Sequence, residues 1–188
     1  MNISAVILAA GKSTRMGQQK LLMPWGNTTV LGKVIETLQA AGVEDIIVVT
    51  NSKIAPQIKS YEFRVAINDG GEMLESIQIG LQAQKPTAEA TLICLGDQPQ
   101  AEERIARSVC DVFRENQSGI VAPSYQMRRG HPWLIAREFW GEVLQLRAPE
   151  SMRDFLNFHK NDIVYVEHDS PSILQDLDTP EDYLKYKP

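Results

Sequence analysis

The alternation of short β-branched runs with stretches of helical spacing is the strongest constraint on how this chain folds. Apolar residues recur at intervals of three and four positions at Val30, Val34, Leu38 and Ala41, which predicts an amphipathic helix. Strands are predicted between such helical stretches, at Ile3 to Leu8, Ile46 to Thr50, Arg64 to Ile67, Thr91 to Leu95, Gly119 to Ala122 and Ile163 to Val166. This alternation is typical of an α/β fold, and we predict a three-layer, doubly wound, mostly parallel sheet of the Rossmann-like type.

The segment from Tyr125 to Ala136 interrupts the alternation. Arg128-Arg129-Gly130 lies there between two extended pieces, so we predict a small hairpin insertion. Further helices are predicted from Glu138 to Leu146, from Met152 to His159, and after the capping sequence Thr179-Pro180-Glu181. Because 188 residues without repeats or linkers suit one core, a single domain over residues 1–188 is expected.

Charge and composition exclude several classes of partner. The formal net charge is −5 and no long run of like charge occurs, so we expect no nucleic acid polymer as partner and only a local phosphate site. Met1 to Leu8 lacks a basic n-region, and no apolar stretch approaches the ~20 residues of a membrane span. A cytoplasmic protein without a membrane partner is therefore expected. Cys94 and Cys110 form no metal-like pair and are expected to be buried free thiols.

A glycine-bearing, cationic loop follows the first apolar run, in the sequence LAAGKSTRMGQQK from Leu8 to Lys20. Glycine lets the backbone approach a ligand, backbone N–H groups form an anion nest, and Arg15 and Lys20 supply charge, which together indicate a polyphosphate site. A P-loop would need a second glycine where Val6 stands, and the dinucleotide fingerprint G-x-G-x-x-G is absent. The alternative is an ordinary strand-to-helix loop with solvated charges.

Acidic residues occur where two further predicted segments reach the same edge of the sheet. Ligands of open α/β sheets bind outside the carboxyl ends of the strands, where Gly96-Asp97-Gln98-Pro99 and Asp176-Leu177-Asp178-Thr179 are expected. Proteins usually bind Mg²⁺ through one or two carboxylates together with substrate phosphates, so these acids suit a metal-bound nucleotide. Either Asp176 or Asp178 could be the second ligand, because residues two apart in a strand point the same way. Alternatively, Asp97 caps a helix that begins near Gln100.

The combination of these segments resembles the molybdenum cofactor nucleotidyltransferases over essentially the whole chain. The similarity lies in LAAGKSTRMGQQK, in LGDQP from Leu95 to Pro99, in RGHP from Arg129 to Pro132 and in LDTPED from Leu177 to Asp182. Leu21 to Trp25 and Gly71 to Ser76 agree as well. The resemblance is closest to the cytidylyl-transferring members. It implies the nucleotidyltransferase version of the Rossmann-like fold and transfer of CMP from Mg-CTP to the terminal phosphate of molybdenum-bearing molybdopterin, with release of pyrophosphate.

The same resemblance implies a role for each matching position. The nucleotide would be bound by Leu8, Ala9, Ala10, Gly11, Arg15, Lys20, Ser76 and Asp97. Of these, Arg15, Lys20 and Asp97 would be catalytic, the two basic residues by holding phosphates. Asp97 and Asp178 would bind Mg²⁺, and Ser76 would lie near the base. The acceptor would be bound by Arg129, Gly130, His131 and Pro132.

Several alternatives remain at this point. Leu8 stands where close cytidylyltransferases can have threonine, so a nucleotidyltransferase that uses GTP or UTP, or acts on a sugar or alcohol phosphate, is the main alternative. A non-catalytic molybdenum cofactor chaperone is a second one. His131 could instead be a packed, hydrogen-bonded residue. Besides CTP and molybdopterin, a client molybdoenzyme or its chaperone is a candidate for transient contact.

Overall fold

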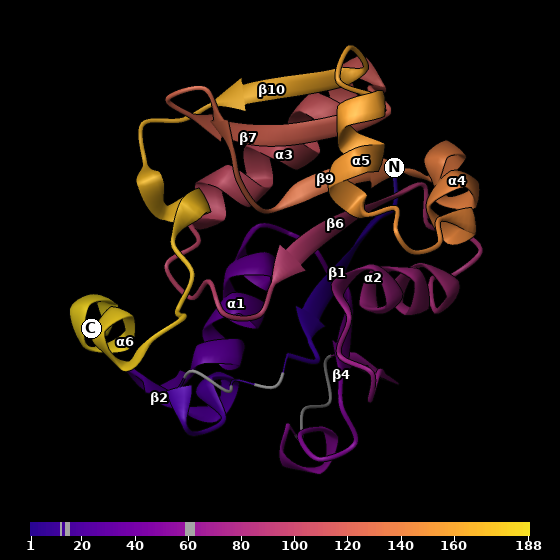
Figure 1. Cartoon of the computed structure of the whole chain (residues 1–188). Helices are drawn as coiled ribbons and strands as arrows, with labels where there is room; N and C mark the ends of the chain where they lie inside the picture. Colours follow the sequence, from indigo (N-terminus) through magenta and orange to yellow (C-terminus); the bar gives the residue numbers. More distant parts are fainter. Residues whose placement is uncertain (12, 14–15, 59–62) are drawn as a thin grey trace.

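The computed structural model covers residues 1–188 and describes all of them except 12, 14–15 and 59–62. In the described part, one sheet of eight strands has the order β10-β7-β9-β6-β1-β4-β5, with β8 paired to β7 (Figure 1). Its strands are β1 (Ile3–Ala9), β4 (Asp45–Thr50), β5 (Arg64–Ile67), β6 (Ala90–Leu95), β7 (Ile120–Tyr125), β8 (Arg128–Arg129), β9 (Trp133–Ala136) and β10 (Ile163–Glu167). A small second sheet joins β2 (Pro24–Trp25) and β3 (Thr28–Thr29).

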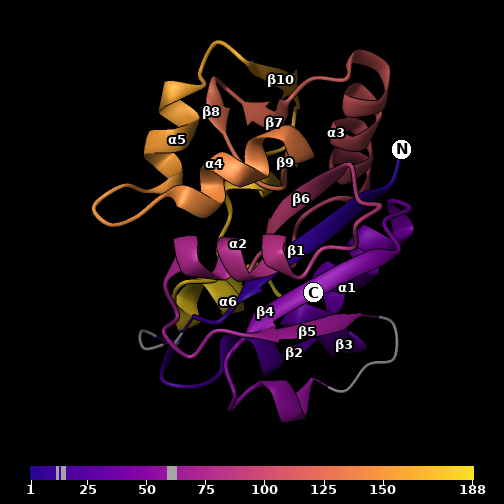
Figure 2. The ribbon, with the colours of Figure 1, turned by 90° about the vertical axis from the view of Figure 1, so that its right-hand side faces the viewer.

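Helices cover both faces of the large sheet, as predicted. They are α1 (Val30–Ala40), α2 (Met73–Gln82), α3 (Glu103–Asn116), α4 (Trp140–Gln145), α5 (Met152–Phe158) and α6 (Pro180–Tyr186). Short 3-10 turns are η2 (Lys20–Leu22), η3 (Ala55–Gln57), η4 (Arg137–Phe139) and η5 (Pro171–Leu174). Figure 2 shows the sheet between α1 and α3 on one side and α2, α4 and α5 on the other. Among the described residues, no helix combines the length and the apolar character that crossing a bilayer requires.

Side chains along β1 alternate between the two faces of the sheet, and each face packs in its own hydrophobic core. Ala5, Ile7 and Ala9 pack with α1 and α3, whereas Val6 packs with α2 on the opposite face. All four side chains are almost completely buried. The strand is hydrophobic throughout because helices cover both of its faces, which is typical of a central parallel strand.

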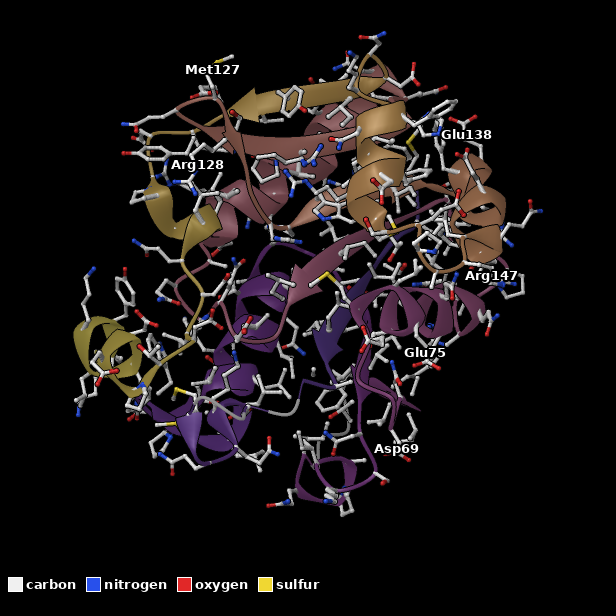
Figure 3. The ribbon with its side chains drawn as sticks, viewed as in Figure 1. Asp69, Glu75, Met127, Arg128, Glu138 and Arg147 are labelled. Carbon is white, nitrogen blue, oxygen red and sulfur yellow. The ribbon has the colours of Figure 1, made fainter. Side chains whose placement is uncertain are left out.

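The predicted hairpin is present, but the segment that contains it also supplies a central strand. β7 and β8 form an antiparallel hairpin whose turn residues, Gln126 and Met127, both have positive φ, as a tight two-residue turn requires. Figure 3 shows Met127 and Arg128 at the outer end of this hairpin. The chain then returns as β9, which lies antiparallel between β6 and β7 with all four side chains buried. The break in the sequence alternation therefore marks a reversal of strand direction within the sheet.

Both cysteines are free and buried, as expected. Burial raises the pKa of the Cys94 thiol, and burial also raises the pKa of the Cys110 thiol to about 11. Both side chains are therefore neutral core residues at physiological pH.

The carboxyl ends of the parallel strands are held together by hydrogen bonds across the sheet edge. The Thr50 hydroxyl donates to the carbonyl of Ala9 over 2.9 Å, and the Gly96 amide donates to the carbonyl of Leu8 over 3.0 Å. After β10, the C-terminal segment passes along the ends of β7 and β6 to reach α6 beside β2 (Figure 1). There the Leu177 amide donates to the carbonyl of Asp97 over 3.0 Å. The edge is thus built from segments that are distant in the sequence.

A glycine on α2 allows that helix to lie directly on β1, and its replacement tests the packing. A Cβ at Gly80 would lie 2.4 Å from Cγ1 and 2.7 Å from Cγ2 of Val6, which is fully buried. We expect Gly80→Ala to lower the free energy of unfolding by about 1–3 kcal/mol through overpacking, measured by urea denaturation. Gly141→Ala on α4 is the matched control, because no atom lies within 4 Å of its Cβ position. Equal effects of the two substitutions would contradict the close approach.

Candidate active site at the carboxyl ends of the strands

The three strand-end segments singled out in the sequence meet at one ion-pair cluster. The Lys20 ammonium, at the start of η2, lies 2.5 Å from Oδ2 of Asp97 and 3.5 Å from Oδ1 of Asp178. The Lys20 side chain is 13% exposed, that of Asp97 21% and that of Asp178 40%. Partial removal from water strengthens the attraction between these charges relative to a surface pair. We call Lys20, Asp97 and Asp178 the strand-end cluster.

The backbone of the glycine-bearing loop is partly fixed by its neighbours. The carbonyls of Leu8 and Ala9 accept the bonds described above, and the carbonyl of Ala10 accepts one from the Asn51 amide over 3.5 Å. Gly11 is exposed, and among the described residues no atom beyond its two chain neighbours lies within 4 Å of the position a Cβ would take. The chain therefore has room at this point for a ligand to approach the backbone closely. Arg15 lies outside the described residues.

Asp97 does not cap the next helix. That helix, α3, begins at Glu103, later than the position near Gln100 considered from the sequence, and its N-cap is Glu102. The Asp97 carboxylate instead accepts a hydrogen bond from Lys20. A strand-end acid that binds a cation from another loop is available for ligand chemistry.

Asp176 and Asp178, which the sequence left equivalent, have different partners. One carboxylate oxygen of Asp176 accepts a hydrogen bond from the side-chain amide of Gln98 over 2.6 Å. Burial raises the pKa of Asp176, and the neighbouring carboxylates of Asp97 and Asp178 raise it further. Asp178 shares the Lys20 ammonium with Asp97. The geometry therefore favours Asp178 over Asp176 as the companion of Asp97.

Ser76 lies inside the fold near the start of α2. It is 2% exposed, its hydroxyl donates to the carbonyl of Glu72 over 3.0 Å, and it accepts from the side-chain amide of Asn68 over 2.8 Å. The side-chain oxygen Oδ1 of Asn68 in turn accepts a hydrogen bond from the backbone amide of Gly71 over 3.1 Å. The hydroxyl is thus engaged in the turn that precedes the helix.

Two asparagines at this edge were not singled out from the sequence. Asn51 directly follows β4, and Asn68 directly follows β5. Their side chains organise the adjacent turns: the Asn51 carbonyl oxygen accepts from the amides of Lys53 and Ile54, each over 3.1 Å. Position immediately after a predicted strand is the signal that would have identified both residues.

The RGHP segment connects β8 to β9 and lies against η5. The Gly130 amide donates to the carbonyl of Pro123 over 3.0 Å, and the His131 amide donates to the carbonyl of Ile173 over 3.1 Å. A Cβ at Gly130 would lie 2.3 Å from that Ile173 oxygen, so this contact requires glycine. His131 and Pro132 also line a small cavity that Gln98 borders from the strand-end side.

The His131 side chain is partly buried and its ring centroid lies 6.4 Å from that of Trp133. Burial lowers the pKa of His131 to about 4, assisted by the positive charge of Arg129. The imidazole is therefore neutral at physiological pH and offers one donor and one acceptor.

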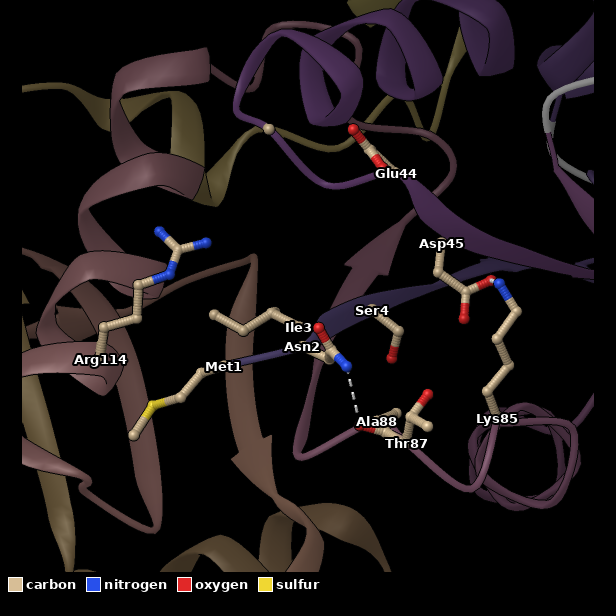
Figure 4. A pocket seen from close by; sticks show the side chains of 11 residues that line it. Met1, Asn2, Ile3, Ser4, Glu44, Asp45, Lys85, Thr87, Ala88 and Arg114 are labelled. Atoms are coloured by element: carbon tan, nitrogen blue, oxygen red, sulfur yellow. Dashed lines mark hydrogen bonds and ion pairs between the residues drawn. The ribbon is translucent and has the colours of Figure 1, made fainter.

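A separate hollow lies at the opposite edge of the sheet, around the start of β1 (Figure 4). Asp45 on its wall pairs with Arg64 over 2.9 Å and with Lys85 over 3.3 Å, and Arg114 pairs with Asp111 over 2.7 Å. These charged groups are satisfied by one another. The strand-end cluster, at the other edge, is the better candidate for chemistry.

The chain is similar in sequence to a known protein family and to curated members of it. The profile of the family described as the MobA-like NTP transferase domain matches residues 5–164. The chain is 27% identical to the molybdenum cofactor cytidylyltransferase of Escherichia coli (strain K12), over 98% of this chain and 95% of that protein. It is also 27% identical to a probable molybdenum cofactor guanylyltransferase of Natranaerobius thermophilus, over 65% of this chain and 60% of the relative.

Solved structures agree with the fold. Rv0371c from Mycobacterium tuberculosis H37Rv is 27% identical with a TM-score of 0.84, over 98% of this chain and 97% of that one. A complex of Rv0371c with manganese superposes with a TM-score of 0.80 at 26% identity, over the same shares of the two chains. The predicted Rossmann-like nucleotidyltransferase fold is thereby confirmed.

The lowered pKa of His131 is directly measurable. NMR titration of its ring protons should give a midpoint near 4, because burial and Arg129 both disfavour the charged imidazole. The unfolded chain takes up this proton near pH 6.5, so His131 favours the folded state above that pH. This contribution is lost as the pH falls towards 4.

Arg129→Gln should raise the midpoint, whereas Arg128→Gln at the exposed end of the hairpin should leave it unchanged. A midpoint near 6.5 in the unsubstituted protein would show that the imidazole is solvated.

Proposed function

The chain belongs to the MobA-like NTP transferase family, and on that premise we propose that it transfers CMP from Mg-CTP to the terminal phosphate of molybdopterin carrying molybdenum, releasing pyrophosphate. The strand-end cluster is the observation that carries this proposal, since it joins a phosphate-binding cation to two carboxylates at a ligand-binding edge. The E. coli cytidylyltransferase aligns with 98% of the chain and the guanylyltransferase relative with 65%, which favours CTP over GTP.

The strand-end cluster has the chemistry of a site for a divalent cation. Asp97 and Asp178 already share one cation, the Lys20 ammonium, and carboxylate oxygens are the ligands that Mg²⁺ and Mn²⁺ prefer. Among the described residues, no group of three or more His, Cys, Asp and Glu side chains is arranged to hold a metal. Because proteins usually bind Mg²⁺ through one or two carboxylates together with substrate phosphates, Asp97 and Asp178 would hold Mg²⁺ jointly with phosphate oxygens of the nucleotide. When bound, Mg²⁺ supplies positive charge to the reacting phosphates.

The chain's own residues would act by alignment and by charge. The acceptor phosphate is already an anionic nucleophile, so the reaction needs no strong general base. One of its oxygens forms a bond to the α-phosphorus of CTP while the bond from that phosphorus to the bridging oxygen breaks, and pyrophosphate leaves. Lys20, together with Arg15, would hold the triphosphate and neutralise charge on the leaving group. The exposed backbone at Gly11 would let the nucleotide approach closely.

The acceptor half of the proposal concerns Arg129 to Pro132. Arg129 would offer a guanidinium to the acceptor phosphate, the partner that suits bidentate recognition. Neutral His131 would add a hydrogen bond to the phosphate or the pterin. Ser76 would act indirectly, by supporting the turn before α2 near the base. After transfer, a client molybdoenzyme or its chaperone would receive the product, and residues 1–188 would act as a single domain.

Release of pyrophosphate tests the function as a whole. Purified protein with Mg²⁺ and molybdenum-bearing molybdopterin should release pyrophosphate fastest from CTP when the four nucleoside triphosphates are compared. A clear preference for GTP would assign the chain to guanylyl transfer. Turnover with a sugar phosphate, and none with molybdopterin, would show that the acceptor is a sugar phosphate. No turnover with any pair, while cofactor still binds, would favour a chaperone.

Removal of the Asp97 charge should affect turnover more than folding. Asp97→Asn keeps the side-chain shape and should lower kcat at least about 100-fold, as expected when a charge that stabilises the transition state is lost. Asp111→Asn on the exposed side of α3 is the matched control and should leave kcat unchanged. Near-normal turnover of Asp97→Asn in saturating Mg²⁺ would contradict the metal assignment.

The position of Lys20, rather than its charge alone, should decide nucleotide binding. Lys20→Ala should weaken CTP binding by about 1–3 kcal/mol in calorimetric titration, because a charge-assisted contact is lost. The same is expected for Arg15→Ala. Lys185→Ala, on α6 against the ring of Tyr186, is the control and should change the binding constant little. Equal small effects at all three positions would place the triphosphate elsewhere.

A further inference from the structure

Gln98 is a buried amide beside the proposed metal ligand Asp97, and the proposed reaction gives it no role. It is 3% exposed, and its Nε2 donates to Oδ1 of Asp176 over 2.6 Å and to the carbonyl of Ile173 over 3.5 Å. A buried polar side chain is retained only at a cost unless its hydrogen bonds are made. Both partners of Gln98 belong to the C-terminal segment.

That segment, Ile173 to Asp178, spans from the RGHP connection to the strand-end cluster. At one end the Ile173 carbonyl accepts from the His131 amide over 3.1 Å, and Gly130 packs directly on Ile173. At the other end the Leu177 amide donates to the carbonyl of Asp97 over 3.0 Å, and Asp178 pairs with Lys20. Ile173 and Leu177 are 1% and 0% exposed. Gln98 binds this segment at Ile173 and at Asp176.

We infer that Gln98 is a positioning residue for both halves of the proposed reaction. Its amide fixes Ile173 and Asp176, and through them the segment sets the place of Asp178 beside Asp97 and the place of Gly130-His131 beside η5. The inference rests on the proposed function for its two half-sites, whereas the hydrogen bonds on which it depends are the observed contacts of Gln98 and of the C-terminal segment. Gln98 acts through other residues and is not assigned a contact with the reacting atoms.

A neutral donor is required at this position because of its surroundings. The Gln98 amide nitrogen lies 2.6 Å from a carboxylate oxygen of Asp176. A carboxylate in place of the amide would put two acceptors at hydrogen-bond distance with no donor between them, and the two groups would repel each other. An apolar side chain would leave the Asp176 carboxylate without its donor. Exchange of the amide of Gln98 and the carboxylate of Asp176 would restore a hydrogen bond between the two positions, with position 176 as the donor and position 98 as the acceptor.

The exchange makes a rescue experiment possible. Gln98→Glu should weaken binding of Mn²⁺ in the presence of CTP by about tenfold or more, measured by the paramagnetic resonance of free Mn²⁺, because residues that support metal ligands typically have effects of this size. It should raise the acceptor KM as well. The Gln98→Glu, Asp176→Asn double variant should recover most of the Mn²⁺ affinity but little of the acceptor KM, because a carboxylate at position 98 cannot donate to the carbonyl of Ile173. Asp176→Asn alone, in which the amide of Gln98 still has an oxygen to donate to, should stay within about threefold.

Each outcome decides the inference. A lower melting midpoint for Gln98→Glu with unchanged Mn²⁺ affinity and acceptor KM would reduce Gln98 to a structural role and overturn it. Loss of Mn²⁺ affinity in Asp176→Asn as large as in Asp178→Asn would make Asp176 a ligand and also overturn it. If Gln98→Glu does not fold, the double variant decides: near-normal binding supports the inference, and a folded protein with tenfold weaker binding contradicts it.

The Mn²⁺ measurement separates this inference from the proposed function. It needs no acceptor and can be repeated with GTP as the nucleotide. If the unsubstituted protein fails to release pyrophosphate with molybdopterin, molybdopterin is ruled out as the acceptor. Rescue of Mn²⁺ binding by the double variant would still show that Gln98 positions the proposed metal site.

Discussion

The contact of one ammonium with two carboxylates is the interaction on which the working edge of this molecule depends. Lys20 lies 77 positions before Asp97 and 158 before Asp178, so the cluster closes the fold between its first and last elements. Partly buried charges are costly unless paired, and loss of one partner leaves the others uncompensated. The loop after β1, the turn after β6 and the C-terminal segment must therefore all be in place together. The parallel sheet makes this possible because its strand ends share one edge.

The charge of the cluster also suits the proposed ligands. Two carboxylates and one ammonium sum to a net negative charge, which favours a further cation, while a triphosphate alone would be repelled by the acids. A triphosphate that arrives with a divalent cation would avoid this repulsion. The two carboxylates would hold the cation together with phosphate oxygens, and Lys20 would gain an anionic partner.

The sequence predicted the layers of the fold well because the parallel strands and the main helices carry strong periodicity. It predicted an extended piece after Gly130 but not the place of β9 between β6 and β7, since Trp133 to Ala136 is only four residues long, is buried on both sides and lacks any alternation. It also could not separate Asp176 from Asp178, because a period of two gives them the same direction. A contact with Gln98, distant in sequence, makes the difference. The roles of the site residues remain predictions, and Arg15 lies outside the described structure.

In the LDTPED motif, several residues fix the backbone that carries Asp178. Asp182 accepts hydrogen bonds from the amides of Asp178 and Thr179, and its capping box with Thr179 starts α6. Tyr183 on that helix donates to the carbonyl of Pro24 over 2.5 Å, which ties α6 to β2, close in sequence to Lys20. Only Asp178 of this motif contacts the ammonium, while its neighbours fix the backbone that presents it. We therefore expect a change at Asp182 to act on the strand-end cluster through the helix cap, because Asp182 binds the amides of Asp178 and Thr179.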